Sequence, residues 1–282
     1  MSEATEPRRD YALGHSPQEL ERLAAQGKLL ECFTRRVFQQ AGIIPGMKVL
    51  DAGSGAGDVA FLAREMVGAD GHVTGTDLSS EAVENARKRA AALGYSNVTF
   101  VETDPCHLSY EQPFDAVVGR FILKYYSDPV AALRRLVRHL RAGGIVSFQE
   151  DDSFGARSFP CAPLFDRLFE LMAKANQMSG AEPRMGLKLY SLFIAADLPA
   201  PAQRVEVPAI GVEDATVDSW VSVLVQTLRS MMPAIIKHEL ATAEGVDIET
   251  YAQRMSREFR AGRGIWLCPP MIGAWTRKPE GL

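Results

Sequence analysis

The sequence predicts an α/β fold in which helices cover both faces of an open, doubly wound sheet. Between residues 46 and 149, a short apolar segment, a turn and an amphipathic segment follow one another repeatedly. Such alternation is typical of parallel strands joined by helical crossovers. The apolar segments are nearly continuous, as expected for strands that are buried on both faces. In a sheet of this kind, ligands bind at the carboxyl ends of the strands.

Five strands are expected in this region, with helices in the gaps between them. The strands are residues 48–52, 73–77, 98–102, 114–119 and 145–149. Ser79 or Ser80 is suited to begin a helix that stops at Gly94, because a serine hydroxyl can accept a hydrogen bond from a free amide of the first turn. Another helix begins near Asp128 and ends before Gly143.

A helix is also expected ahead of the first strand. Ser16, Pro17 and Glu19 have the spacing of a helix start, with a serine cap and a glutamate that completes the capping box. The helix runs toward Ala41, and Gly27 is a point at which it could break.

The alternation loosens after residue 149. Helices are expected at residues 160–178 and 187–196, and a strand at residues 204–211. An apolar helical stripe between Trp220 and Ile236 is interrupted by Pro233. A last strand follows at residues 264–277, bent or interrupted by its two adjacent prolines. We therefore expect three parts: an N-terminal helical lid (1–44), a ligand-binding core (45–150), and late strands with an inserted helical cap (151–282).

Composition excludes several classes of function. The chain has 31 Lys and Arg against 35 Asp and Glu, so no basic surface for nucleic acid is expected. Its four cysteines are far apart, which predicts neither a zinc site nor a disulfide framework. It contains no run of 18 apolar residues, and its first residues are polar. We expect a cytoplasmic protein, a monomer or homodimer that acts on a small molecule away from membranes.

The segment VLDAGSGAGD (residues 49–58) forms a glycine-rich turn after the first strand. Such a turn often cradles the pyrophosphate of a dinucleotide. Here, however, Asp51 precedes the glycines and Asp58 follows them, and carboxylates repel phosphate. The glycine spacing is G-x-G-x-G, whereas the dinucleotide motif is G-x-G-x-x-G. The turn therefore favours a ligand that carries a positive charge.

Three acids lie at or just after the ends of three successive strands and suit S-adenosylmethionine. Asp51 can attract its amino group, while the glycines allow the backbone to approach its methionine part. Asp77, at the end of the second strand, can accept hydrogen bonds from the ribose hydroxyls. Asp104, after the third strand, can accept one from the adenine amine. Each acid could instead have a structural role, Asp51 and Asp77 as helix caps and Asp104 in a turn.

With these acids in register, the chain resembles the class I S-adenosylmethionine-dependent methyltransferases. The branch it resembles is the small-molecule one, which includes enzymes of ubiquinone and menaquinone biosynthesis. Five segments match family segments in order: VLDAGSGAGD, VTGTDLS, VETDP, PFDAVVGR and LRAGGIVSFQE. The terminal IGAWTRKP matches more loosely.

The resemblance implies a Rossmann-like sheet of seven strands in the order 3-2-1-4-5-7-6, with the last strand antiparallel. It also implies methyl transfer from S-adenosylmethionine, leaving S-adenosylhomocysteine. The residues expected to bind the cofactor are Asp51, Gly53, Ser54, Gly55, Asp58, Asp77, Leu78, Asp104, Pro105 and Arg120.

Catalytic residues are harder to predict, because the sulfonium already activates the methyl group and the protein chiefly aligns the reactants. His15 is the candidate base and Tyr11 a candidate contact, both on a segment that could close over the cofactor. An exposed histidine on a loose tail is the alternative. Glu150 opens an acidic cluster after the fifth strand, which could bind an amine or a metal or be a solvated loop. No metal ligand is assigned.

Tyr125, Phe154 and Trp220 are the candidate pocket residues. The inserted helices are expected to carry many aromatic and methionine residues, at 154, 159, 165, 169, 172, 178, 220, 231 and 232. They suggest a roomy apolar pocket, although a core or a dimer contact has the same composition. We expect methyl transfer to O, C or N of an apolar or aromatic metabolite. Alternatives are a non-methylating binding protein or a cyclase on the same fold and, less favoured, a nicotinamide oxidoreductase.

Overall fold

The computed structural model describes residues 17–107, 110 and 112–281, and its central feature is a seven-stranded sheet. The strand order is β3-β2-β1-β4-β5-β10-β7, and β10 runs antiparallel to both of its neighbours. Counted along the chain, this is the order 3-2-1-4-5-7-6, which confirms the expected Rossmann-like sheet. The strands are β1 (Lys48–Ala52), β2 (His72–Asp77), β3 (Val98–Glu102), β4 (Phe114–Arg120), β5 (Leu140–Asp151), β7 (Ala202–Glu206) and β10 (Met271–Arg277).

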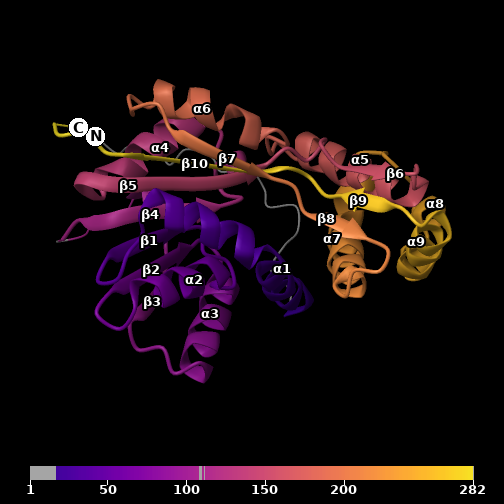
Figure 1. The fold of residues 1–282 in the computed structure, drawn as a ribbon, viewed down its shortest axis with the longest axis horizontal. Coiled ribbons are helices and arrows are strands. Elements are labelled where there is room, and N and C mark those ends of the chain that lie inside the picture. The colour runs from indigo at the N-terminus through magenta and orange to yellow at the C-terminus, as the bar shows by residue number, and fades with distance from the viewer. Residues whose placement is uncertain (1–16, 108–109, 111, 282) are drawn as a thin grey trace.

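Helices cover both faces of this sheet (Figure 1). On one face lie α1 (Pro17–Ala41), α2 (Asp58–Val67) and α3 (Ser80–Ala92). On the other lie α4 (Pro129–Arg138) and α6 (Met185–Ala195). Successive residues of β1 and β4 point to opposite faces, and residues 49–52 and 116–119 are all buried, so Val49 packs under the first group of helices and Leu50 under the second. This double burial explains the nearly continuous apolar segments.

Local signals for helix starts are confirmed at two positions. The Ser79 hydroxyl accepts a hydrogen bond from the Ala82 amide and caps α3. The Asp128 carboxylate accepts one from the Ala131 amide and caps α4. Ser16 lies outside the described residues.

The remaining elements form a cap beside the carboxyl edge of the sheet, at the right in Figure 1. The cap consists of β6 (Arg157–Phe159), α5 (Pro163–Met178), β8 (Ala209–Gly211), α7 (Val217–Lys237), α8 (Ala243–Val246), α9 (Ile248–Gly262) and β9 (Ile265–Leu267). Its three strands form a separate sheet in the order β6-β9-β8. Two short 3-10 helices, η1 (Pro105–His107) and η2 (Leu123–Tyr125), follow β3 and β4.

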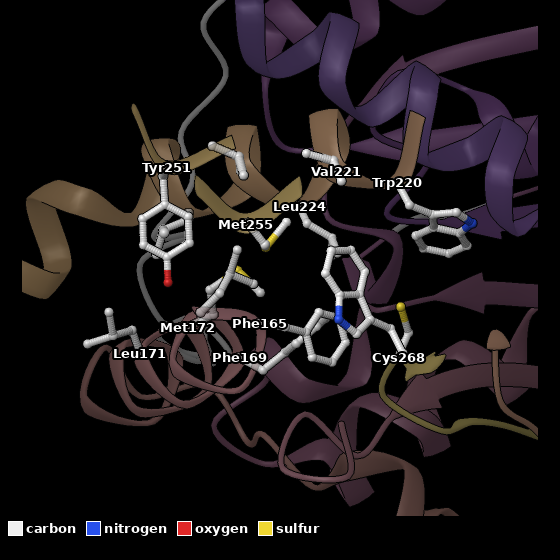
Figure 2. Packing of buried hydrophobic residues seen from close by; sticks show 14 of the residues in the cluster. Phe165, Phe169, Leu171, Met172, Trp220, Val221, Leu224, Tyr251, Met255 and Cys268 are labelled. Carbon is white, nitrogen blue, oxygen red and sulfur yellow. The ribbon is translucent and has the colours of Figure 1, made fainter. Parts of the chain in front are cut away.

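The cap has a hydrophobic core of its own, in which α5, α7 and α9 converge (Figure 2). The indole of Trp266 is fully buried at its centre, stacked against Phe259 with ring centroids 3.8 Å apart and against Phe165 at 4.7 Å. Aromatic pairs of this kind add stability beyond the area that they bury. The cap is therefore a packed subdomain and not a loose insertion.

Helix α1 is continuous through Gly27, so the break considered from the sequence does not occur. A Cβ atom at this position would lie 2.5 Å from Cγ of Asp58. The glycine therefore allows α1 and the start of α2 to approach closely, and its weak helix propensity is outweighed by packing.

One strand prediction needs correction and another is confirmed. The expected strand at 204–211 is two strands, β7 in the main sheet and β8 in the cap, with Pro208 between them. The interruption expected within residues 264–277 is present, because these residues form β9 and β10 on either side of Pro269 and Pro270. Each proline lacks an amide for a ladder, so the chain leaves one sheet there and enters the other.

Two helix predictions also need correction. Pro233 does not interrupt α7, because the apolar residues on either side of it, Met231 and Ile235, are buried in the cap and hold the helix together. Phe154 and Phe159 are not on helices: Phe154 lies in the turn after β5, and Phe159 lies on β6, where it is 76% exposed. None of the helices in the described part of the chain has the length and hydrophobicity needed to span a bilayer.

Candidate functional site

A cavity of about 480 Å³ lies between the carboxyl edge of the sheet and the cap. We call the part against the glycine turn the turn end, lined by Gly53, Ser54, Gly55, Asp58, Asp77 and Arg120. We call the part inside the cap the cap end, lined by Phe169, Met172, Trp220, Leu224, Met231 and Met271. One wall of the cavity comes from α1 and another from the segment after β4.

The glycine turn has a backbone that only glycine adopts easily. Gly53, Gly55 and Gly57 have φ values of 70°, 51° and 91°, all in the left-handed region. A Cβ atom at Gly53 would lie 2.4 Å from Cδ1 of Ile122, and one at Gly57 would lie 2.9 Å from the Phe100 ring. The turn therefore presents backbone to the cavity while it packs tightly on its other side.

Asp51 lies beneath this turn, completely buried and outside the cavity wall, and neither of its carboxylate oxygens has a hydrogen-bond partner among the described residues. Burial raises the pKa of this carboxyl to about 7, while the charge of Arg120 and the nearby Ala60 amide, which does not reach hydrogen-bonding geometry, act in the opposite direction. A buried acceptor without a donor is costly. The site would therefore be stabilised by a ligand that brings a donor or a positive charge close to Asp51.

Asp77 joins the turn to the end of β2. Its carboxylate accepts a hydrogen bond from the Gly55 amide at 2.9 Å and another from the Ser79 amide at 3.0 Å. Asp77 and the exposed Leu78 both line the cavity. The carboxylate thus fixes the turn and still faces the space where a ligand would bind.

Asp58 and Arg120 bring opposite charges to the turn end. The carboxylate of Asp58 forms an ion pair with Arg89 at 2.8 Å. The guanidinium of Arg120 donates to the Thr34 hydroxyl at 3.0 Å, and that hydroxyl donates to Gln149 at 2.8 Å. Burial lowers the pKa of Arg120, whereas Asp58 and Asp51 favour its charged form. A zwitterionic ligand would find both signs of charge here.

Asp104 and Pro105 do not line the cavity in the described part of the chain. One carboxylate oxygen of Asp104 accepts a hydrogen bond from the Cys106 amide at 2.9 Å, and the other lies 3.6 Å from Nδ1 of His107. Asp104 therefore helps to build the turn after β3. Its role toward adenine stays a prediction.

Among the candidate pocket residues, Tyr125 and Trp220 line the cavity, whereas Phe154 lies outside it, with the Arg184 guanidinium 5.0 Å from its ring centre. Burial raises the pKa of Tyr125, and Asp151 and Glu150 raise it further. Its hydroxyl therefore keeps its proton at neutral pH. Tyr125 can donate a hydrogen bond to a ligand but is poorly suited to act as a base.

Glu150 does not line the cavity and is completely buried. Its Oε1 atom accepts hydrogen bonds from the Ile122 and Leu123 amides at 2.8 and 2.7 Å. Burial raises the pKa of Glu150 to about 8, against the attraction of Lys124. His15 and Tyr11, the other catalytic candidates, lie outside the described residues.

A polar cluster that was not predicted from the sequence links α1 to α7. Arg22 and Glu19 form a buried ion pair, and Arg22 also donates to Gln26 at 2.9 Å and to the Thr227 hydroxyl at 3.0 Å. The Ser230 hydroxyl donates to Glu19 at 2.8 Å. Residues 19, 22 and 26 are spaced so that they lie on one face of a helix, and this spacing is the feature of the sequence that could have indicated the cluster. Their partners on α7 could not be read from the sequence.

Asn176 on α5 was also missed. It lines the cavity, and its Oδ1 atom is buried without a hydrogen-bond partner among the described residues. In residues 17–107, 110 and 112–281, no three His, Cys, Asp or Glu side chains are grouped so that they could hold a metal ion.

Comparison with known proteins supplies an independent finding. The model of a family described as "Methyltransferase domain" matches residues 43–196. A demethylmenaquinone methyltransferase from Staphylococcus aureus (strain MRSA252) is 33% identical over 141 residues, which are 50% of this chain and 55% of the relative. The aklanonic acid methyltransferase DauC from Streptomyces sp. (strain C5) is 34% identical over 138 residues, 48% and 62% of the two chains. The chain thus spans less than two thirds of these curated relatives.

Several solved structures share the fold over most of the length of this chain. The YcgJ protein from Bacillus subtilis has a TM-score of 0.57 at 20% identity and covers 88% of this chain and 99% of its own. A putative methyltransferase from Bacillus halodurans C-125 has a TM-score of 0.58 at 18% identity, with 87% and 98% covered. The [4+2]-cyclase SpnF has a TM-score of 0.50 at 22% identity, with 89% and 82% covered. Likeness at these identities concerns the fold alone.

Proposed function

Because the chain belongs to the methyltransferase domain family, we propose that it transfers a methyl group from S-adenosylmethionine to a small, uncharged, apolar or aromatic molecule. The observation that carries the proposal is the division of one cavity into two chemically different ends. Charged groups and a glycine backbone line the turn end, and apolar side chains line the cap end. The methyl donor would occupy the first and the acceptor the second.

The turn end fits the charges of S-adenosylmethionine. Asp51 lies behind the glycine turn, outside the cavity wall, and would attract the α-ammonium group by its charge, directly or through a bridging water that relieves the unpartnered carboxylate. Arg120 offers the opposite charge for the methionine carboxylate, and Asp77 can accept from the ribose hydroxyls. Gly53, Ser54, Gly55, Asp58 and Leu78 would form the surrounding wall. The cofactor supplies a methyl carbon already activated by its sulfonium.

The cap end fits an acceptor without charge. Its wall is made of thioether, aromatic and aliphatic side chains, which offer nothing to a charged group. Where the two ends meet, the charged side chains are bound to one another: Arg22 pairs with Glu19, and Lys124 with Asp151. The name of one relative, for demethylmenaquinone, is consistent with this class of acceptor. The other name, for aklanonic acid, indicates an acceptor that carries a carboxyl group and is consistent only with an apolar or aromatic one. Asn176 and Tyr125 would orient its polar atoms.

The protein's part in the reaction is alignment and exclusion of water. The cap and α1 enclose the space next to the turn end, which supports the lid role proposed for residues 1–44. A base is needed only for an acceptor that retains its proton, and His15 and Tyr11 stay candidates for this step. We place the protein in the cytoplasm, where its four free cysteines would stay reduced.

The test is transfer of a tritium-labelled methyl group from S-adenosylmethionine to a panel of aromatic and quinone-like acceptors. We expect incorporation into uncharged members and none with the Asp77→Ala variant. Tight binding of S-adenosylmethionine without incorporation into any acceptor would instead favour a binding protein or a cyclase. Binding of reduced nicotinamide dinucleotide, seen by fluorescence, would favour an oxidoreductase.

A further inference from the structure

The last three residues of β5 bind the four consecutive residues that follow β4, residues 121–124, and are linked through Thr34 to Arg120 at the end of β4. The Gln149 carbonyl accepts from the Phe121 amide at 2.9 Å, and the Gln149 side chain accepts from Thr34, which in turn accepts from Arg120. Glu150 accepts from the amides of residues 122 and 123. The Asp151 carboxylate pairs with the Lys124 ammonium at 2.6 Å. Glu150 and Asp151 of the acidic cluster are thus bound to backbone and side-chain groups of the protein itself.

Glu150 is the centre of this arrangement. Both of its amide contacts go to a single atom, Oε1, and the side chain has no exposed surface. Two backbone amides at the start of η2 would otherwise be buried without acceptors, which is costly. The hydrogen bonds therefore fix the path of the backbone at residues 121–123.

That path determines the wall of the cavity where its two ends meet. Phe121 has a φ of 57°, a conformation that non-glycine residues adopt only when their surroundings enforce it. Ile122 packs against Gly53 of the glycine turn and against Gly119. Phe121 and Ile122 both line the cavity. A change in this backbone would move side chains on the donor and acceptor sides together.

We propose that Glu150 is a positioning residue, which holds Phe121 and Ile122 in place between methyl donor and acceptor by accepting the amides of residues 122 and 123. It acts through the backbone and does not touch either reactant, because it lies outside the cavity wall. The proposal rests on the proposed function for its kinetic consequence, whereas its structural consequence can be measured without any methyl transfer.

Two variants separate positioning from chemistry. Glu150→Gln keeps an oxygen at the position of Oε1 and loses the carboxylate. Glu150→Asp keeps the carboxylate but is one methylene shorter, so its oxygen cannot reach both amides. If Glu150 is a positioning residue, Glu150→Gln should keep the activity of the wild type and Glu150→Asp should lose it. If its carboxylate is catalytic, Glu150→Asp should keep the activity and Glu150→Gln should lose it.

The first measurement is hydrogen exchange at the amides of residues 122 and 123 in the whole protein. We expect exchange at least about tenfold faster in Glu150→Asp, because an amide that loses its acceptor opens more easily, and unchanged within about twofold in Glu150→Gln. The matched control is Glu258→Gln, since Glu258 accepts the Leu164 amide at 2.9 Å within the cap. The control should leave residues 122 and 123 unaffected. Unchanged exchange in Glu150→Asp would overturn the proposal.

The second measurement is methyl transfer per folded molecule, well below the unfolding temperature. We expect kcat to fall about tenfold to a hundredfold in Glu150→Asp, since misplacing the reactants by a small distance has effects of this size, and to stay within about threefold in Glu150→Gln. Loss of kcat in Glu150→Gln with protected amides would overturn positioning in favour of a catalytic role. If Glu150→Asp has a lower unfolding temperature but unchanged kcat and KM, Glu150 has a structural role only. If the wild type transfers no methyl group, the proposed function fails, and the exchange experiment still decides the positioning.

Discussion

The turn end and the cap end of the cavity are built in different ways. At the turn end, Asp51 is buried without a partner, and the backbone is left-handed at three glycines. At the cap end, side chains are apolar and well packed, and the charged residues at its border are paired. The first region leaves a buried carboxylate without a partner, which a charged ligand would relieve, whereas the second leaves the amide oxygen of Asn176 without a partner, which an uncharged hydrogen-bond donor would satisfy. The buried polar groups that the chain leaves without hydrogen-bond partners thus indicate which kind of ligand each end of the cavity binds.

The largest effect expected at the turn end comes from Asp77→Ala. The variant loses the acceptor of the Gly55 and Ser79 amides and the proposed acceptor of the ribose hydroxyls, so we expect the affinity for S-adenosylmethionine to fall at least about a hundredfold. Titration calorimetry measures it. Asp115→Ala, at the opposite edge of the sheet, is the control and should leave the affinity unchanged. Equal affinities in wild type and Asp77→Ala would remove Asp77 from the site.

A second difference between the ends is the response of the ligand-free protein to pH. Burial raises the pKa of Asp51 to about 7, with Arg120 opposing and Asp77 and Asp58 adding to the rise. A carboxyl whose folded pKa lies above its unfolded value of 3.8 contributes stability below that value and loses it as the pH rises through about 7. Burial also raises the pKa of Glu150 to about 8, with Lys124 opposing the rise and Asp151 adding to it, so Glu150 likewise loses its contribution to stability as the pH rises through about 8.

We therefore expect the melting temperature of the ligand-free protein to fall by several degrees as the pH rises from about 4 to about 8, with the part due to Asp51 complete by about pH 7. Circular dichroism measures it. Asp51→Asn should reduce the fall below about pH 7, because the amide has no charge to bury, and leave the part due to Glu150. The same slope in wild type and variant would show that Asp51 does not cause it.

At the cap end, Met172→Gln should affect the acceptor alone. The amide has nearly the shape of methionine but adds polar atoms to an apolar wall, so we expect KM for an uncharged acceptor to rise about tenfold. The affinity for S-adenosylmethionine should stay within about twofold. A comparable loss of both affinities would mean that the two ends are not separate.

The smallest effect is expected where α1 meets the cap. Ser230→Ala removes the hydroxyl that donates to the buried Glu19 at 2.8 Å, and we expect the free energy of unfolding to fall by about 1 kcal/mol. Urea unfolding measures it. Glu19 also binds Arg22, so the ion pair should persist in the variant. An unchanged free energy would show that this hydrogen bond does not stabilise the contact of α1 with α7.

The sequence predicted the turn end better than the cap end, for a physical reason. Strand patterns and the acids Asp51 and Asp77 are local signals, and the resemblance supplied the sheet order that the structure confirms. The cap depends on contacts between distant segments, such as Arg22 with Thr227, which no local pattern records. Glu150 shows the same limit, because an acid after a strand suggested ligand chemistry while its partners are backbone amides of another loop.

The most direct test of the central claim is a calorimetric titration of wild type and Asp51→Asn with S-adenosylmethionine. The two-ended cavity predicts one binding site per chain in the wild type, and an affinity at least about tenfold lower in Asp51→Asn, where the charge that attracts the ammonium is gone. It also predicts tighter binding as the pH rises through about 7 in the wild type only, since Asp51 ionises there. No binding by the wild type, or equal affinity and pH dependence in both proteins, would contradict the account.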